Sequence, residues 1–323
     1  MGAQWGRANV LKTDILPMCP ARCAGQTPLG TRKDMLPYPD INPVGFHIGP
    51  LPIHWYGLLE IISFFIGTLW LIRRGRLPYW GWGKEQVFDL EFYLAIGAIG
   101  GGRIGYVLWY DLPYYLGHPI QILKVWDGGM SFHGGLIGVI LGCWAYARQH
   151  GRSTMATLDF VAPAAPIGLG LGRLANFIND QLFGRVSHLP WAIVFPAGGP
   201  QPRQPSQIYE FLLEGVLLLL ILGIYSRKPR PAGAVGSLFV LGYGLFRFAV
   251  EYTRQPDIQL GFVMGPLDMG QILSIPMILL GPVLLWWAYR GGFETPHFGP
   301  RTVPVQSGPD PSPSPRGKQR QDP

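Results

Sequence analysis

The chain has 323 residues, of which 48% are hydrophobic and only 14% are charged. Soluble domains carry about 25% charged residues, so this composition excludes an ordinary soluble protein and indicates a chain that crosses a membrane several times. The formal net charge of +7 would suit a nucleic-acid-binding protein. However, the basic residues gather in short loops beside apolar segments, where orientation and anionic lipid account for them, and nucleic acid is therefore rejected as a partner.

Seven apolar segments follow one another along the chain, each close to the roughly 20 residues that a helix needs to cross the hydrocarbon core of a bilayer. The sequence therefore predicts an all-α, polytopic membrane protein with about seven transmembrane helices. The predicted helices cover residues 54–72, 90–109, 130–147, 159–178, 209–225, 234–253 and 272–289.

The two ends of the chain differ in composition from this apolar block. Residues 1–34 contain several basic side chains but no continuous apolar core, and we expect a disordered extension or a misassigned start, with Met35 as the more natural beginning. Residues 296–323 are rich in Pro, Ser and charge and are expected to form a disordered cytoplasmic tail. The transmembrane domain is expected to span residues 35–295.

Basic residues are concentrated in alternate loops, and this predicts the orientation. The basic residues after the first, third, fifth and seventh segments are Arg73, Arg74, Arg76 and Lys84, then Arg148 and Arg152, then Arg227, Lys228 and Arg230, and finally Arg290. The intervening loops hold Lys124, Arg185 and Arg203. Because cytoplasmic loops are enriched in Lys and Arg, we expect the N-terminus outside and the C-terminus in the cytoplasm.

The second segment contains AIGAIGGGRIGYVLWY, which places Arg103 near the middle of the membrane after three glycines. A charged side chain there costs roughly 2.5–3.5 kcal/mol on insertion scales, so it needs a partner or a purpose. A glycine-lined helix contact beside a snorkelling arginine is the structural alternative.

The third segment opens with GGMSFHGGLIG, which places His133 near the outer end of a helix. A lone histidine is more often a hydrogen-bonded structural residue, but glycines on both sides would leave this ring accessible for proton transfer. The three cysteines have no metal-ligand spacing, and Cys143 is interpreted as a small core residue. We predict neither a metal nor an organic cofactor.

The fourth segment ends in GRLANFINDQLFGR. If the helix continues that far, Arg173, Asn176 and Asn179 stand three residues apart on one face, and a guanidinium and two amides converge near the outer interface. A solvated helix end is the structural alternative.

The sixth segment contains GYGLFRFAVEYTRQPD, in which Tyr243, Arg247 and Glu251 follow one another in steps of four residues, with Arg254 close to the same face. An ion pair between Arg247 and Glu251 could simply neutralise itself within the bundle, and it leaves two other intramembrane arginines unexplained. Together with Arg103 and Arg173, Arg247 makes three arginines that face Glu251 and a second candidate, Glu210. This count predicts an excess of positive charge, which suits a phosphate ester.

Residues 51–290 resemble the prolipoprotein diacylglyceryl transferases of the bacterial inner membrane. Six motifs carry the resemblance, in the family's order: HWYGLL, GGRIGYVLWY, SFHGGLIG, GRLANFINDQLFGR, RQPSQIYE and YGLFRFAVEYTRQPD. The resemblance implies seven membrane spans, an active site toward the periplasm, and two partners: phosphatidylglycerol and prelipoprotein signal peptides with a lipobox cysteine. The implied reaction moves the diacylglyceryl group to the cysteine thiol, forming a thioether and releasing glycerol phosphate.

The same resemblance assigns roles to individual residues. His133 and Tyr243 match residues considered essential, and Arg173 and Arg247 match arginines that bind the lipid head group. Tyr56 falls at a further functional tyrosine. The remaining matches, at signature positions, are Asn176, Asn179, Gly184 and Glu251, and Arg103 is grouped with the head-group-binding residues because of its charge.

The chain departs from the family at one place. The family's Gly-Glu after the two asparagines is replaced by Asp180-Gln181, so the expected carboxylate is missing at Gln181. Asp180 could substitute for it, although adjacent helical residues point about 100° apart. A lipid transporter or a non-catalytic lipid-binding membrane protein remains the alternative function, because either would also line its interior with arginines.

Overall fold

The computed structural model describes residues 36–39, 41–110, 112–125, 128–255, 262–264 and 267–293. The predicted extension at residues 1–34 and the predicted tail at residues 296–323 lie outside the described residues.

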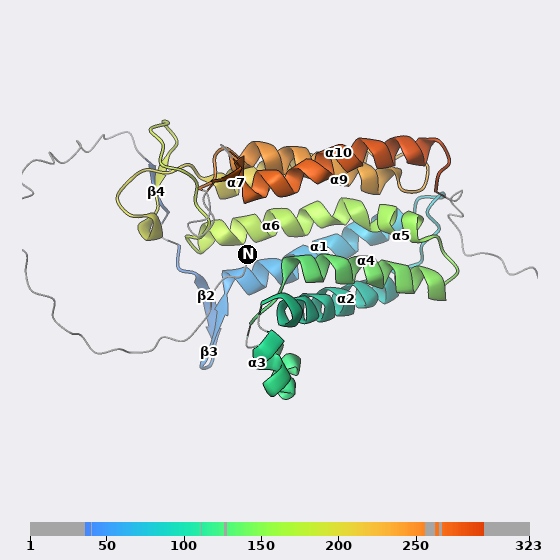
Figure 1. Cartoon of the computed structure of the whole chain (residues 1–323), viewed down its shortest axis with the longest axis horizontal. Coiled ribbons are helices and arrows are strands. Elements are labelled where there is room, and N and C mark those ends of the chain that lie inside the picture. The colour runs from blue at the N-terminus through green and yellow to red at the C-terminus, as the bar shows by residue number, and fades with distance from the viewer. Residues whose placement is uncertain are drawn as a thin grey trace, which may run out of the picture.

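The described chain is built mostly of helices that run roughly side by side (Figure 1). The longer helices are α1 (Trp55–Gly75), α2 (Lys84–Tyr110), α4 (Phe132–Gln149), α5 (Thr154–Val161), α6 (Ala165–Ile178), α8 (Leu218–Tyr225), α9 (Ala234–Glu251) and α10 (Met269–Tyr289). The short ones are α3 (Leu112–Gly117), η1 (Pro119–Leu123), η3 (Ala162–Ala164), η4 (Pro196–Gly198), α7 (Ser206–Glu210) and the π-helical η5 (Phe211–Leu217).

Short strands occur at the ends of the helices. They are β1 (Leu36–Pro37), β2 (Val44–Ile48), β3 (Leu51–His54), β4 (Ile193–Val194), β5 (Phe262–Met264) and β6 (Leu267–Asp268). β1 pairs in parallel with β4, whereas β2 with β3 and β5 with β6 form antiparallel pairs. The β2–β3 hairpin projects from one end of the bundle, beside the start of α1 (Figure 1).

Each of the seven predicted apolar segments is helical. Among the described residues, six helices are long and apolar enough to cross a membrane: α1, α2, the α5–α6 run, the α7–α8 run, α9 and α10. The third predicted segment, α4, is not among them, because His133, Arg148 and Gln149 occupy its ends and several glycines dilute its apolar residues.

Successive long segments run in opposite directions, so the loops between them gather at two ends of the bundle (Figure 1). The loops from α1 to α2, from α4 to α5 and from α8 to α9, together with the residues after α10, lie at one end. These are the loops in which the sequence concentrates its basic residues. The start of α4, the end of α6, the start of α7 and the end of α9 lie at the opposite end.

α2 and α4 pack together through facing glycines. A Cβ atom added at Gly97 would lie 2.2 Å from the carbonyl oxygen of Gly138, and one at Gly101 would lie 2.4 Å from that of Gly134. In a bilayer, where lipid is as apolar as the helices, such backbone contact drives association by van der Waals packing. Cys143, on α4, is fully buried, which confirms the prediction that it is a core residue.

The fourth predicted segment is divided in two, which hydropathy alone did not predict. Prolines at positions 163 and 166 remove backbone N–H donors from the helix. The chain therefore passes from α5 through the single turn η3 into α6 and still continues as one apolar run over Thr154–Ile178.

Aromatic side chains fix the end of the bundle that carries the basic loops. Trp82 stacks on Phe160 with ring centroids 4.4 Å apart. The guanidinium of Arg152 lies 4.1 Å from the centre of the Trp82 ring, and that of Arg74 lies 4.4 Å from the centre of Trp80. Cation–π contacts of this kind let basic loop residues add to packing as well as to charge.

Candidate active site

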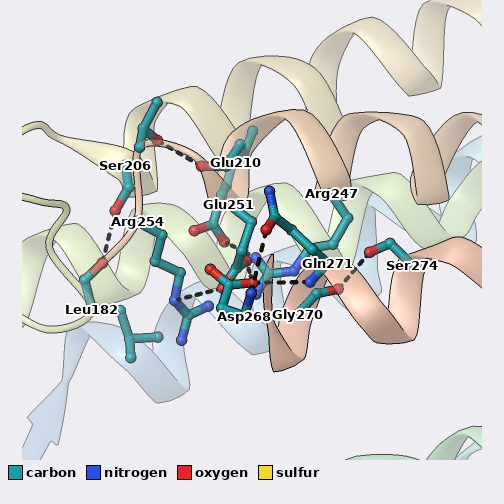
Figure 2. A network of polar contacts seen from close by, with 12 residues as sticks. Leu182, Ser206, Glu210, Arg247, Glu251, Arg254, Asp268, Gly270, Gln271 and Ser274 are labelled. Atoms are coloured by element: carbon teal, nitrogen blue, oxygen red, sulfur yellow. Dashed lines mark hydrogen bonds and ion pairs between the residues drawn. The ribbon is translucent and has the colours of Figure 1, made fainter. Parts of the chain in front are cut away.

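A cluster of charged and amide side chains lies where α6, α7, η5, α9 and α10 converge. Figure 2 shows the part of it that comes from α7, α9, α10 and the residues next to them. We call the whole group the ion-pair cluster. Its members are Arg173, Glu210, Glu214, Arg247, Glu251, Arg254, Asp268 and Gln271. Arg173 is partly exposed and the other members are buried. The cluster lies at the end of the bundle opposite the basic loops.

Glu210 holds two arginines from different helices. Its Oε2 lies 2.5 Å from Nε of Arg173 on α6 and 3.3 Å from Nη1 of Arg247 on α9. The second terminal nitrogen of Arg247 lies 2.8 Å from Oε2 of Glu251, which confirms the predicted pair between these two residues. One carboxylate therefore brings the two arginines of the fourth and sixth segments to a common point.

Glu214 is a second fully buried carboxylate of the cluster, and the sequence prediction missed it. Its Oε1 lies 3.8 Å from Nη1 of Arg247, and neither of its oxygens makes a hydrogen bond with a described residue. Glu214 lies in η5, one turn after Glu210, and π-helical turns of this kind occur frequently at functional sites. Two glutamates four residues apart in the apolar run YEFLLEG were the available signal.

The predicted excess of positive charge is wrong for this cluster. Its three arginines, Arg173, Arg247 and Arg254, face three glutamates, Glu210, Glu214 and Glu251. Its fourth carboxylate, Asp268, pairs with Arg185, which lies 3.7 Å away and outside the cluster. The physical reason is the cost of removing charge from water, which makes unpaired buried charges unfavourable. The count from sequence omitted one glutamate and included Arg103, whose described partners lie elsewhere. Arg173 likewise has a counter-ion that the sequence did not reveal.

Tyr243 lies one turn before Arg247 on α9 and is close enough to Glu214 and Arg247 to interact with them electrostatically. Its ring stacks on Phe239, with centroids 6.0 Å apart and planes 18° from parallel. The phenol is thus oriented by an apolar neighbour while its hydroxyl belongs to the charged region.

Tyr56 reaches the same region from α1. It is half exposed and interacts electrostatically with Glu60 and Arg173. α1 and α6 are in contact here: a Cβ atom at Gly172 would lie 3.5 Å from Oε1 of Glu60, an ordinary van der Waals distance.

The asparagines of the opening motif occupy different geometries. Asn176 lies one turn after Arg173 on α6 and is buried, as the predicted helix face requires. α6 ends at Ile178, so Asn179 is its C-cap. The side-chain oxygen of Asn179 is buried without a hydrogen-bond partner among the described residues, and buried polar atoms are rarely left in that state.

The departure from the family pattern falls in a turn outside the helix. Asp180 has a positive φ of 52°, and its Oδ2 accepts a hydrogen bond of 2.5 Å from the backbone N–H of Ala197. Burial raises the pKa of Asp180, and that hydrogen bond opposes the increase. Gln181 is exposed, and its backbone carbonyl accepts a hydrogen bond of 2.6 Å from Nε2 of Gln207. The carboxylate of Asp180 therefore fastens η4 to the end of α6.

Gly184 occupies a position that has no room for a side chain. A Cβ atom there would lie 2.5 Å from the carbonyl oxygen of Thr253 and 2.6 Å from that of Gln204. The backbone N–H of Gly184 donates to the same Gln204 carbonyl at 2.8 Å. This segment threads between the residues before α7 and those after α9, and so holds the ends of three helices together.

His133 lies in the first turn of α4 and is exposed, as its glycine neighbours predict. Its ring meets Phe132 edge-on at a centroid distance of 5.7 Å and makes no hydrogen bond with a described residue. α4 begins at the end of the bundle that holds the ion-pair cluster (Figure 1). No contact among the described residues joins His133 to the arginines.

Arg103 lies on α2 and is separate from the ion-pair cluster in its contacts. Its guanidinium donates to the backbone carbonyls of Gln121, Ile122, Gly128 and Gly129.

Comparison with known proteins agrees with the motifs. The family model described as prolipoprotein diacylglyceryl transferase matches residues 43–287. A phosphatidylglycerol–prolipoprotein diacylglyceryl transferase of Pseudomonas paraeruginosa is 55% identical over 259 residues, which cover 79% of this chain and 97% of the relative. A protein of the same name from Vibrio vulnificus is 55% identical over 258 residues, covering 80% and 95%. The chain belongs to the prolipoprotein diacylglyceryl transferase family.

Proposed function

We propose that this chain transfers the diacylglyceryl group of phosphatidylglycerol to the thiol of a prelipoprotein lipobox cysteine. The names of the similar proteins supply both substrates. The observation that carries the proposal is the sharing of one Glu210 oxygen by Arg173 and Arg247. Two guanidinium groups held at one point from separate helices can grip a phosphate ester through several oxygens.

The chemistry begins with the thiol, whose pKa of about 8.5 leaves it mostly protonated at neutral pH. We assign His133 as the base that accepts the thiol proton, because its ring is exposed and free of described hydrogen bonds. The sulfur then bonds to the carbon of the diacylglycerol unit that bears the phosphate. The carbon–oxygen bond breaks, and its electron pair leaves with the oxygen of glycerol phosphate.

The arginines act on the leaving group. Charge grows on the departing phosphate, and Arg173 and Arg247 stabilise it in a site that is poor in water. Glu251 keeps Arg247 oriented through its 2.8 Å contact, so little rearrangement is needed during the reaction. No metal or organic cofactor is part of the proposed reaction.

Neutral polar groups complete the proposed lipid site. The amide of Asn176 lies one turn beyond Arg173, and the unpaired side-chain oxygen of Asn179 lies about two turns beyond it, where a glycerol head group can hydrogen-bond. Tyr56 approaches from α1 and contributes a further hydroxyl. We assign Tyr243 to the reacting centre, because it adjoins Arg247 and Glu214.

The proposal includes a place and an orientation in the cell. We place the chain in a bacterial inner membrane with seven spans, namely the six apolar helices and α4, with the N-terminus outside and the C-terminus in the cytoplasm. The support is that the basic loops gather at one end of the bundle, whereas the start of α7 and the end of α9, which carry members of the ion-pair cluster, lie at the other (Figure 1). The positive end would face the cytoplasm and the site the periplasm.

Incubation of the purified protein with phosphatidylglycerol and a lipobox peptide tests this function. We expect the peptide to gain the mass of a diacylglyceryl group, and we expect His133→Ala to lose most of that activity while remaining folded. Binding of phosphatidylglycerol without any gain in peptide mass would favour a transporter or a non-catalytic lipid-binding protein. Near-normal thioether formation by His133→Ala would refute its role as the base.

A further inference from the structure

The guanidinium of Arg103 binds backbone carbonyls from two separate parts of the connection between α3 and α4. Its Nε donates to the carbonyl of Ile122 at 2.9 Å, and one Nη donates to that of Gln121 at 2.5 Å. The other Nη donates to Gly128 at 2.5 Å and to Gly129 at 3.2 Å. The segment that leaves η1 and the segment that enters α4 are therefore held by one side chain.

The Gly128–Gly129 turn is shaped to receive this side chain. Both glycines have positive φ, 83° and 76°, a conformation that other residues rarely adopt. A Cβ atom at Gly129 would lie 2.9 Å from Nη1 of Arg103 and 2.7 Å from the ring of Tyr106. The backbone thus approaches the guanidinium more closely than a side chain would permit.

Four hydrogen bonds account for most of the five N–H donors of the guanidinium. Arg103 is only 4% exposed, and its guanidinium lies 5.2 Å from the centre of the Tyr115 ring. A phosphate would have to displace backbone carbonyls to bind here, and the carbonyls would then lose their partner in a buried place, which is costly. These contacts do not suit a lipid-binding role for Arg103.

The contacts made by α2 extend from this turn to the start of α4. The backbone N–H of Ser131 donates to the carbonyl of Gly102, next to Arg103, at 2.8 Å. Ser131 caps α4, and its Oγ accepts from the N–H of Gly134. His133 lies between these two residues. α2 contacts the backbone on both sides of it, through the hydrogen bond to Ser131 and through Gly134, where an added Cβ atom would lie 2.3 Å from the carbonyl oxygen of Gly101.

We propose that Arg103 is a positioning residue of the transferase: it holds the Gly128–Gly129 turn and, through that turn, the first residues of α4 that carry His133. The inference rests on the proposed function for its effect on turnover. Lysine has the charge but not the planar fork, so Arg103→Lys cannot bind carbonyls on both sides of the connection at once.

A double-variant cycle tests the link to His133. We expect Arg103→Lys to lower kcat by about tenfold, with the KM for phosphatidylglycerol within about twofold, because an interaction that orients a reacting group affects turnover more than binding. In the His133→Ala background, the same change should lower the remaining rate by less than about twofold, because residues that act through one group are non-additive. Arg148→Lys, an exposed arginine at the other end of α4, is the matched control and should retain normal kinetics.

Hydrogen exchange of the peptide that contains Ser131 gives a readout independent of activity. We expect its amide to exchange at least about tenfold faster in Arg103→Lys, because local opening becomes easier when buried hydrogen bonds are lost. Unchanged exchange would overturn the positioning role. A raised KM with unchanged kcat would instead show lipid binding, and fully additive losses would show an effect separate from His133. Near-normal activity of His133→Ala would refute the proposed base and the link from Arg103 to turnover. Faster exchange in Arg103→Lys would still show that Arg103 holds the start of α4.

Discussion

Glu210 joins two helices of the site, because its carboxylate pairs with Arg173 on α6 and with Arg247 on α9. We expect Glu210→Gln to lower thioether formation by at least about tenfold and to lower the midpoint of thermal unfolding. Removing one partner of a buried ion pair costs about 3–5 kcal/mol, and the remaining glutamates reduce this cost by still pairing with Arg247.

Activity assays and thermal unfolding in detergent measure both effects of Glu210→Gln. Glu85→Gln, which removes an exposed carboxylate in the first turn of α2, serves as the control and should leave both values unchanged. If Glu210→Gln behaved like this control, the common point of the two arginines would have no role in the reaction.

Asp180 shows which role of the family's carboxylate this chain retains. We expect Asp180→Asn to cost little activity, because asparagine keeps an acceptor oxygen for the N–H of Ala197 and tolerates a positive φ. Gln181→Glu should also change little, since Gln181 is exposed. Thioether formation by both variants decides the question: a loss above about a hundredfold for Asp180→Asn, the lower scale for removing an acid or base, would mean that it transfers a proton.

Residues that share a helix could be predicted to interact, and those brought together by tertiary packing could not. The pair of Arg247 and Glu251 follows from their separation of four residues on a single helix. The pairing of Arg173 with Glu210 depends on how α6 packs against α7, which no local pattern determines. The capture of Arg103 by carbonyls of a distant loop was equally invisible, because every residue offers a carbonyl.

At the scale of the elements, hydropathy located all seven long segments but not their polar ends. α2 begins at Lys84, six residues before the predicted start at residue 90, because hydropathy marks the hydrocarbon-spanning part of a helix and the first turns carry charge. The break between α5 and α6 and the π-helical turn before α8 depend on backbone hydrogen bonds. A hydropathy profile does not contain that information.

The glycine contact between α2 and α4 provides a test at this scale. A Cβ atom at Gly138 would lie 1.8 Å from the carbonyl oxygen of Gly97, so Gly138→Ala must push the two helices apart. We expect a loss of about 1–3 kcal/mol in the free energy of unfolding, the usual cost of overpacking. Gly57→Ala on α1, where a Cβ atom meets nothing within 4 Å, is the control in thermal unfolding. Equal midpoints for the two variants would contradict this packing.

At the scale of the whole molecule, the distribution of basic loops predicts that the two ends of the bundle face different compartments. In a variant without the native cysteines, we expect a membrane-impermeant thiol reagent to label His188→Cys in cells whose outer membrane alone is permeable. Lys228→Cys should react only after the inner membrane is opened, because it follows α8 at the basic end. Both positions are exposed, so the reverse pattern would invert the proposed orientation.

The central claim is that the sulfur attacks carbon, so that the carbon–oxygen bond of the diacylglycerol breaks and a phosphate ester leaves toward the paired arginines. Phosphatidylglycerol with heavy oxygen in the bridge between the diacylglycerol carbon and phosphorus tests it directly, with mass spectrometry of both products after reaction with a lipobox peptide. The account predicts that all of the heavy oxygen leaves with glycerol phosphate and that the peptide thioether contains none. Heavy oxygen retained on the diacylglycerol product would place the cleavage at phosphorus and would contradict the proposed attack at carbon.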